Sequence, residues 1–177
     1  MKALGHVDIL VNNAGAAWGA PAEDHPIDAW DKVMNLNVRG YFILSQYIGK
    51  HSMIPRRSGT IINIASITGL GGNPTGINTI AYNTSKGAVV NLTRSLAVEW
   101  AREGIRVNAI APTWVRTDFI ESLTAQPELM ARIEAMTPMG RIAEVDEIVG
   151  GVIYLASPAA GMVTGHTLAI DGGFLAQ

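Results

Sequence analysis

The chain has 177 residues, with 13 basic and 15 acidic side chains and a formal net charge of −2. Hydrophobic residues make up 48% of the chain and charged residues only 16%, a composition that excludes an intrinsically disordered protein. The charge balance gives no basic surface for nucleic acid or an anionic membrane, and the lack of cysteine excludes disulfides and thiolate metal sites. We expect one domain over residues 1–177 and no metal site, because the histidines also lack the spacing of metal ligands.

The first half of the chain alternates between apolar runs and helical patterns. Residues 7–12 are mostly apolar and end in the sequence Asn-Asn-Ala-Gly at 12–15, which predicts a buried strand followed by a turn. Apolar side chains at three- and four-residue steps predict a helix over 27–51. A second strand is predicted over 59–65, and a glycine-rich connection follows it at 69–76.

The second half repeats the alternation. A long helix is predicted over 80–102 and a third strand over 106–111. Residues 117–136 predict a helical excursion that two prolines interrupt. A further helix over 145–156 and a last strand over 166–170 complete the series.

Strands that alternate with helices and are apolar on both faces indicate a parallel sheet covered by helices on both sides. The chain is therefore predicted to be an α/β protein. Its first strand is apolar throughout, as a central strand would be, yet only three more strands follow it. Such a strand would leave an uncovered edge, so we expect further chain before Met1 in the natural protein. Residues 1–15 lack the pattern of a signal peptide, which predicts a cytoplasmic location.

Tyr82 and Lys86 are the most informative pair of residues in the sequence. Four positions apart near the start of the predicted long helix, they lie on one helical face. A tyrosine with a reference pKa near 10 exchanges protons poorly at neutral pH, and a nearby ammonium group favours the phenolate. We therefore expect Lys86 to lower the pKa of Tyr82. The structural alternative is a surface lysine that stacks over a partly buried tyrosine.

Three other segments end at the same edge of the predicted sheet. Ser66 follows the second strand, the 12–15 turn follows the first, and residues 112–117 follow the third. Open parallel sheets bind ligands at the carboxyl ends of their strands, so these segments predict a site shared with Tyr82. Trp18, Trp114 and Met139 are candidates for its walls.

These motifs, in this order, resemble those of the smaller type of short-chain dehydrogenase/reductase. The segment RVNAIAPTWVRT at 106–117 is similar to the family's strand and loop beneath the nicotinamide, and residues 67–89 look most like gluconate and deoxygluconate dehydrogenases. The resemblance implies the C-terminal catalytic part of a doubly wound, Rossmann-type sheet. It implies a catalytic set of Asn37, Ser66, Tyr82 and Lys86. It also implies cofactor contacts from Asn12, Ala14, Gly15, Tyr82, Lys86, Pro112, Val115 and Thr117.

The chemistry that the resemblance implies is hydride transfer between NAD or NADP and a secondary alcohol or ketone, on a substrate such as a sugar acid or polyol. Tyr82 would be the general acid or base, and Lys86 would lower its pKa and bind the nicotinamide ribose. Ser66 would hold the substrate oxygen, and Asn37 would anchor a water in the proton relay. The family also implies a homo-oligomer, either a dimer or a tetramer.

Two features depart from the family pattern. The Pro-Gly that follows the third family strand is here Pro112-Thr113, and the TGxxxGxG turn that holds the pyrophosphate does not occur in the chain. The GLGGNP sequence at 69–74 nearly imitates a phosphate-binding turn, but we interpret it as an active-site loop because Pro74 replaces the last glycine. We expect weak or absent cofactor binding by these residues alone, with no readable preference between NAD and NADP. The alternative function is a non-catalytic remnant that associates with a full-length relative.

Overall fold

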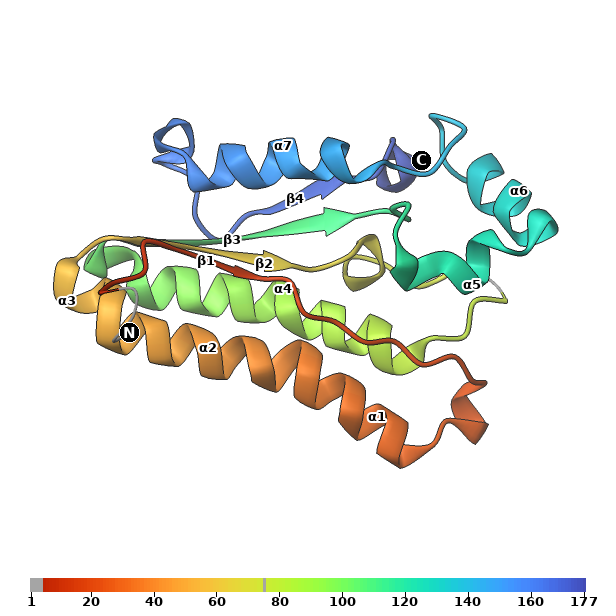
Figure 1. Ribbon diagram of the computed structural model, residues 1–177, viewed down its shortest axis with the longest axis horizontal. Helices are drawn as coiled ribbons and strands as arrows, with labels where there is room; N and C mark the ends of the chain where they lie inside the picture. The colour runs from red at the N-terminus through yellow and green to blue at the C-terminus, as the bar shows by residue number, and fades with distance from the viewer. Residues whose placement is uncertain (1–4, 75) are drawn as a thin grey trace.

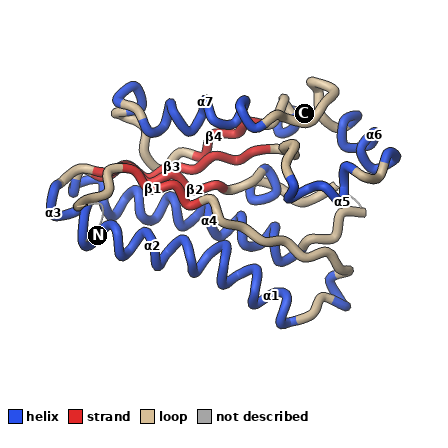
Figure 2. Tube along the Cα trace, viewed as in Figure 1, coloured by secondary structure: helices blue, strands red, loops and turns tan. Residues whose placement is uncertain are grey.

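The computed structural model describes residues 5–74 and 76–177. Its centre is a parallel sheet of four strands in the order β1-β2-β3-β4, with helices above and below it (Figures 1 and 2). The strands are β1 Ile9–Asn12, β2 Gly59–Ile64, β3 Ile105–Pro112 and β4 Thr167–Ile170. The predicted α/β class is therefore confirmed. Residues 1–4 and Thr75, which fall within the predicted domain and the predicted glycine-rich connection, lie outside the described residues.

The helices follow the predicted alternation, but the first helical region contains π-helical segments that the sequence did not predict. Between β1 and β2 the chain is helical from Ile27 to Arg56, but two π-helical segments widen it at Asn35–Arg39 and Gly49–Met53. Around these segments the α-helices are α1 Ile27–Met34, α2 Gly40–Ile48 and α3 Ile54–Arg56. The remaining helices are α4 Ile80–Trp100, α5 Glu121–Thr124, α6 Pro127–Ala135 and α7 Val145–Ala156.

Two predicted elements differ from the structure for local reasons. The strand predicted from residue 7 begins at Ile9, because the backbone N–H of Val7 donates to the Ser52 hydroxyl at 2.8 Å instead of joining the sheet. The excursion predicted over 117–136 divides into α5 and α6. Pro127 begins α6, where a helix tolerates the missing N–H.

Alternate side chains of the central strands pack against different helices. Ile61 of β2 packs with Leu96 and Ala97 of α4, whereas its neighbour Ile62 packs with Leu155 of α7. Figure 1 shows the same division, with α1, α2 and α4 below the sheet and α7 above it. The sheet is therefore the middle of three layers, and its central strands β2 and β3 are covered on both faces.

The placement of α7 gives the last connection an unusual hand. All four strands are parallel and each new strand is added on the same side of the previous one. The first two connections cross one face of the sheet, and α7 crosses the other (Figure 1). The β3-α7-β4 connection must therefore have the opposite hand from the first two, a rare arrangement in parallel sheets. It brings the start of α7 beside the loop that leaves β3.

Strand β1 forms one edge of the sheet. Ile9 is 48% exposed and Val11 40% exposed, so the strand predicted to be buried is largely exposed, because it has a neighbour on one side only. Within the described residues, every helix is either too short or too polar to cross a membrane.

Candidate functional site

A cleft of about 1060 Å³ lies at the carboxyl ends of β1, β2 and β3. It is the position that the strand ends predict for a ligand. Apolar side chains make up much of its wall. Its polar lining includes Asn13, Ser66, Tyr82, Lys86, Thr113 and Thr117.

Tyr82 and Lys86 lie in the first two turns of α4 and both face this cleft. The Lys86 ammonium donates to the backbone carbonyl of Ile64 at 2.6 Å, which ties it to the end of β2. Its Nζ lies 5.4 Å from the ring centre of Tyr82 and 5.6 Å from that of Tyr41. The predicted pair is thus brought together, with a fixed cation beside the phenol ring.

Ser66, which follows β2, lines the same cleft as Tyr82 and Lys86. It caps the short helical turn that follows β2, because its Oγ accepts from the Thr68 backbone N–H at 3.2 Å and lies 3.1 Å from the Thr68 hydroxyl. Ser66 also lowers the pKa of the Tyr82 phenol. A hydroxyl, a phenol and an ammonium group therefore converge at one end of the cleft.

The pKa values of Tyr82 and Lys86 differ from our expectation. Burial raises the pKa of the Tyr82 phenol above its usual value, and the neighbouring Ser66 opposes this effect. Burial also lowers the pKa of Lys86 to about 8. The predicted lowering of the Tyr82 pKa by Lys86 is therefore not found: burial has the largest influence on this pKa, and Ser66 is the neighbour that opposes it. Burial favours the neutral form of both groups.

Asn37 lies behind the cleft, in the first π-helical segment, and is fully buried. Its side-chain oxygen accepts from the N–H of Ala16, and its amide nitrogen donates to the carbonyl of Ala16, both at 2.9 Å. The same nitrogen donates to the Ser85 hydroxyl at 2.9 Å. Both amide hydrogens are thus used in fixing the loop after β1 and the start of α4. The anchoring of a water by Asn37 stays a prediction.

The residues expected to hold a cofactor divide into two groups. Gly15, Pro112, Val115 and Thr117 line the cleft with Tyr82 and Lys86, whereas Asn12 and Ala14 do not. The Asn12 amide is buried and donates to the Ser45 hydroxyl at 3.1 Å and to the Asn63 side-chain oxygen at 2.8 Å. Its neighbour Asn13 lines the cleft instead.

The lining donors suit the ribose hydroxyls and carboxamide of a nicotinamide cofactor. They are the ammonium group of Lys86, the phenol of Tyr82, the hydroxyl of Thr117 and the amide of Asn13. The residues present therefore fit the nicotinamide half of the cofactor.

Several lining residues carried no signal in the sequence. The ring of Phe119 lies 6.0 Å from that of Tyr82, and Val145, Val149 and Val152 of α7 form part of the opposite wall. Their contribution depends on the side of the sheet that α7 covers, which periodicity does not reveal. Trp18 and Trp114 line the cleft as considered, but Met139 lines a separate, smaller cavity.

Similar proteins give a consistent description of this arrangement. A family model described as enoyl-(acyl carrier protein) reductase matches residues 1–175. The 2-dehydro-3-deoxy-D-gluconate 5-dehydrogenase of Escherichia coli (strain K12) is 42% identical over 174 residues, which cover 98% of this chain and 68% of that protein. The galactitol 2-dehydrogenase (L-tagatose-forming) of Cereibacter sphaeroides is 44% identical over 173 residues, covering 98% and 67% of the two chains.

A solved structure matches the fold equally well. The gluconate 5-dehydrogenase from Burkholderia cenocepacia J2315, crystallised in complex with NADP and tartrate, has a TM-score of 0.93 and 37% sequence identity. The match covers 98% of this chain and 67% of that one. The chain thus spans about two thirds of the length of the relatives it matches.

Proposed function

Because this chain belongs to the short-chain dehydrogenase/reductase family, we propose that it interconverts a secondary alcohol and a ketone with a nicotinamide cofactor. The observation that carries the proposal is the convergence of Tyr82, Ser66 and Lys86 at one end of the cleft. Residues 1–177 would then be the catalytic portion of the enzyme.

In this reaction the chain's own residues manage the proton. The neutral Tyr82 phenol donates its proton to the oxygen of a ketone, and its phenolate takes the proton back from an alcohol. Ser66 hydrogen-bonds the same substrate oxygen and so holds it beside the phenol. Lys86 places a positive charge beside the phenolate when it forms, and Asn37 keeps α4 and the loop after β1 in register.

NAD or NADP would supply or accept the hydride. Lys86 and Tyr82 would bind its ribose, and Val115, Thr117, Gly15 and Asn13 would enclose the nicotinamide. Excluding water from this apolar cleft would favour transfer to the substrate carbon over side reactions.

The substrate we propose is a polyol or a sugar acid. The relatives named above include dehydrogenases of both kinds, a galactitol dehydrogenase and gluconate-type dehydrogenases. We also propose that the protein works in the cytoplasm as a homo-oligomer. The alternative function is that of a non-catalytic protein. The chain spans about two thirds of its relatives' length, and without catalytic activity it would act by associating with a longer relative through the exposed edge of β1.

The test compares Tyr82→Phe with Tyr47→Phe, since Tyr47 is an exposed tyrosine on α2 away from the cleft. Turnover of NADP or NAD with galactitol and with gluconate is followed by the absorbance of the reduced cofactor. We expect Tyr82→Phe to lose activity by about 10²-fold or more, as removal of a general acid does. Tyr47→Phe keeps full activity and unchanged cofactor affinity, and calorimetry shows that Tyr82→Phe still binds the cofactor although it has lost its contact with the ribose. Activity above a few per cent in Tyr82→Phe, or no activity in the unsubstituted chain, would refute the proposal.

A further inference from the structure

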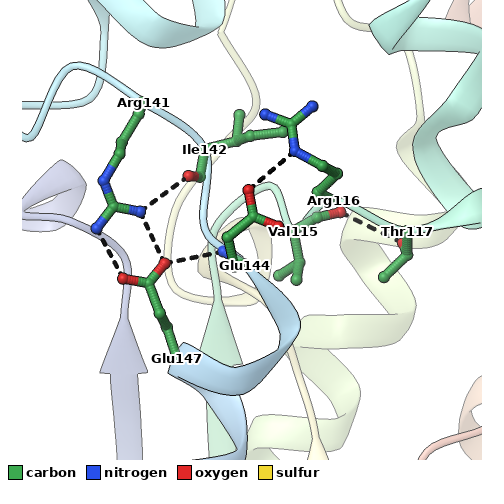
Figure 3. Close-up of polar contacts among 7 residues, drawn as sticks. All are labelled: Val115, Arg116, Thr117, Arg141, Ile142, Glu144 and Glu147. Atoms are coloured by element: carbon green, nitrogen blue, oxygen red, sulfur yellow. Dashed lines mark hydrogen bonds and ion pairs between the residues drawn. The ribbon is translucent and has the colours of Figure 1, made fainter.

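We propose that two surface arginine–glutamate pairs position the Val115–Thr117 loop for cofactor binding. The four residues, Arg116, Arg141, Glu144 and Glu147, are called the clasp below. Arg116–Glu144 joins the loop after β3 to the beginning of α7, and Arg141–Glu147 joins the segment before α7 to its first turn (Figure 3). The inference rests on the proposed function, because it gives these residues a part in binding the nicotinamide cofactor.

The first pair is bidentate. Arg141 donates from Nη1 and Nη2 to the two carboxylate oxygens of Glu147, both at 2.7 Å. Glu147 also accepts from the backbone N–H of Glu144 at 2.9 Å. These contacts lower the pKa of Glu147 to about 2, so its charge is constant over the working pH range of an enzyme. A planar guanidinium on a carboxylate fixes direction as well as distance.

The second pair reaches the loop itself. Arg116 donates from Nε to the Glu144 carboxylate at 2.9 Å. Glu144 is also the N-cap of α7, and its side chain and that of Glu147 form a reciprocal capping box. The two carboxylates that cap the helix are therefore the same two that hold the arginines.

Backbone hydrogen bonds also join the loop to the segment that precedes α7. The N–H of Arg116 donates to the carbonyl of Ala143, and the N–H of Ala143 donates to the carbonyl of Trp114, both at 2.9 Å. This short parallel bridge sets Val115 opposite Ala143. Val115 and Thr117 line the cleft from the loop, and Val145 and Val149 line it from α7. The clasp thus fixes one wall of the cleft to another.

Because the clasp is exposed, we expect it to affect the position of the loop more than the free energy of unfolding. The side chains of Arg116 and Glu144 are 56% and 55% exposed, and those of Arg141 and Glu147 are 47% and 41% exposed. Exposed ion pairs contribute little to the free energy of unfolding. Their effect is local: a loop already held in its bound position loses less conformational entropy when a ligand binds. Arg141 and Glu147 also line a cavity of about 70 Å³ that shares Thr113 with the main cleft.

The test is the double variant Arg116→Gln/Arg141→Gln, which removes both guanidinium groups and leaves the capping carboxylates in place. Its matched control is Arg57→Gln, which removes the exposed Arg57–Glu103 pair at the other end of the sheet. Three quantities are measured for each protein: amide hydrogen exchange at residues 116 and 143, NADPH and NADH affinity by calorimetry, and the urea midpoint.

We expect exchange at residues 116 and 143 to accelerate about tenfold in the double variant. The cofactor dissociation constant should rise about fivefold, with a urea midpoint close to that of Arg57→Gln. Arg116→Lys/Arg141→Lys keeps the charges and should recover part of the affinity. Unchanged exchange or unchanged affinity in the double variant would overturn the inference. Absence of cofactor binding by the unsubstituted chain would refute the proposed function instead, and the exchange rates would still decide whether the clasp holds the loop.

Discussion

The two sides of the cleft are held in place by different means. On the α4 side, Asn37 is 0% exposed and Lys86 3% exposed, and their polar atoms bond to buried or half-buried partners. On the loop side, Arg116 and Glu144 are both more than half exposed and pair at the surface. A buried polar network is costly to disrupt, whereas an exposed ion pair is not. The groups that we propose handle the proton are therefore fixed by folding, and the loop proposed to hold the cofactor is held by local contacts.

Removing the centre of the buried side should have the largest effect on stability. Asn37→Ala deletes three hydrogen bonds and leaves the Ala16 backbone groups and the Ser85 hydroxyl without their partner. We expect the free energy of unfolding to fall by about 3 kcal/mol, as measured by urea denaturation. Asn35→Ala, an exposed residue of the same π-helical segment, is the control and should be close to neutral. Equal losses in the two variants would contradict a special role for the buried amide.

A smaller effect should follow from the burial of Lys86. Its folded pKa of about 8 lies below the usual lysine pKa of 10.5, so between these values the unfolded chain binds more protons and stability rises with pH. From pH 8 to pH 9.5 the unsubstituted protein should gain about 1.5 kcal/mol relative to Lys86→Met. Tyr41 and Tyr82 are present in both proteins, so their titration cancels in the difference. Parallel stability curves for the two proteins would show that Lys86 is not desolvated.

Much of the α4 side was predictable from the sequence. Helical geometry places residues four apart on one face, so the spacing of Tyr82 and Lys86 was sufficient to pair them. The end of an apolar strand similarly located Ser66. The sign of the Tyr82 pKa shift was predicted wrongly, because a sequence shows a neighbouring charge but not the depth of burial.

Other features depend on partners distant in the chain. The π-helical segment at Asn35–Arg39 contains Asn37, which bonds to Ala16 and Ser85, 21 and 48 residues away. Periodicity within one helix carries no information about such contacts. The choice between Asn12 and Asn13 is of the same kind, because it depends on which side of β1 meets the buried Asn63. The clasp could not be predicted either, since it requires knowing which face of the sheet α7 covers.

The smallest expected change in stability comes from separating the two tasks of Glu144. A serine at this N-cap, with Glu147 three residues later, is a favoured capping box, so Glu144→Ser retains the cap of α7 and loses only the Arg116 pair. We expect the free energy of unfolding to stay within about 0.5 kcal/mol of the parent value. Amide exchange at residue 116 should nevertheless accelerate, because the loop has lost its ion pair with the start of α7. A variant that is stable and keeps the parent exchange rate would show that the backbone bridge to Ala143 holds the loop without the ion pair. The two sides of the cleft would then differ in the exposure of their polar groups and not in what holds them in place.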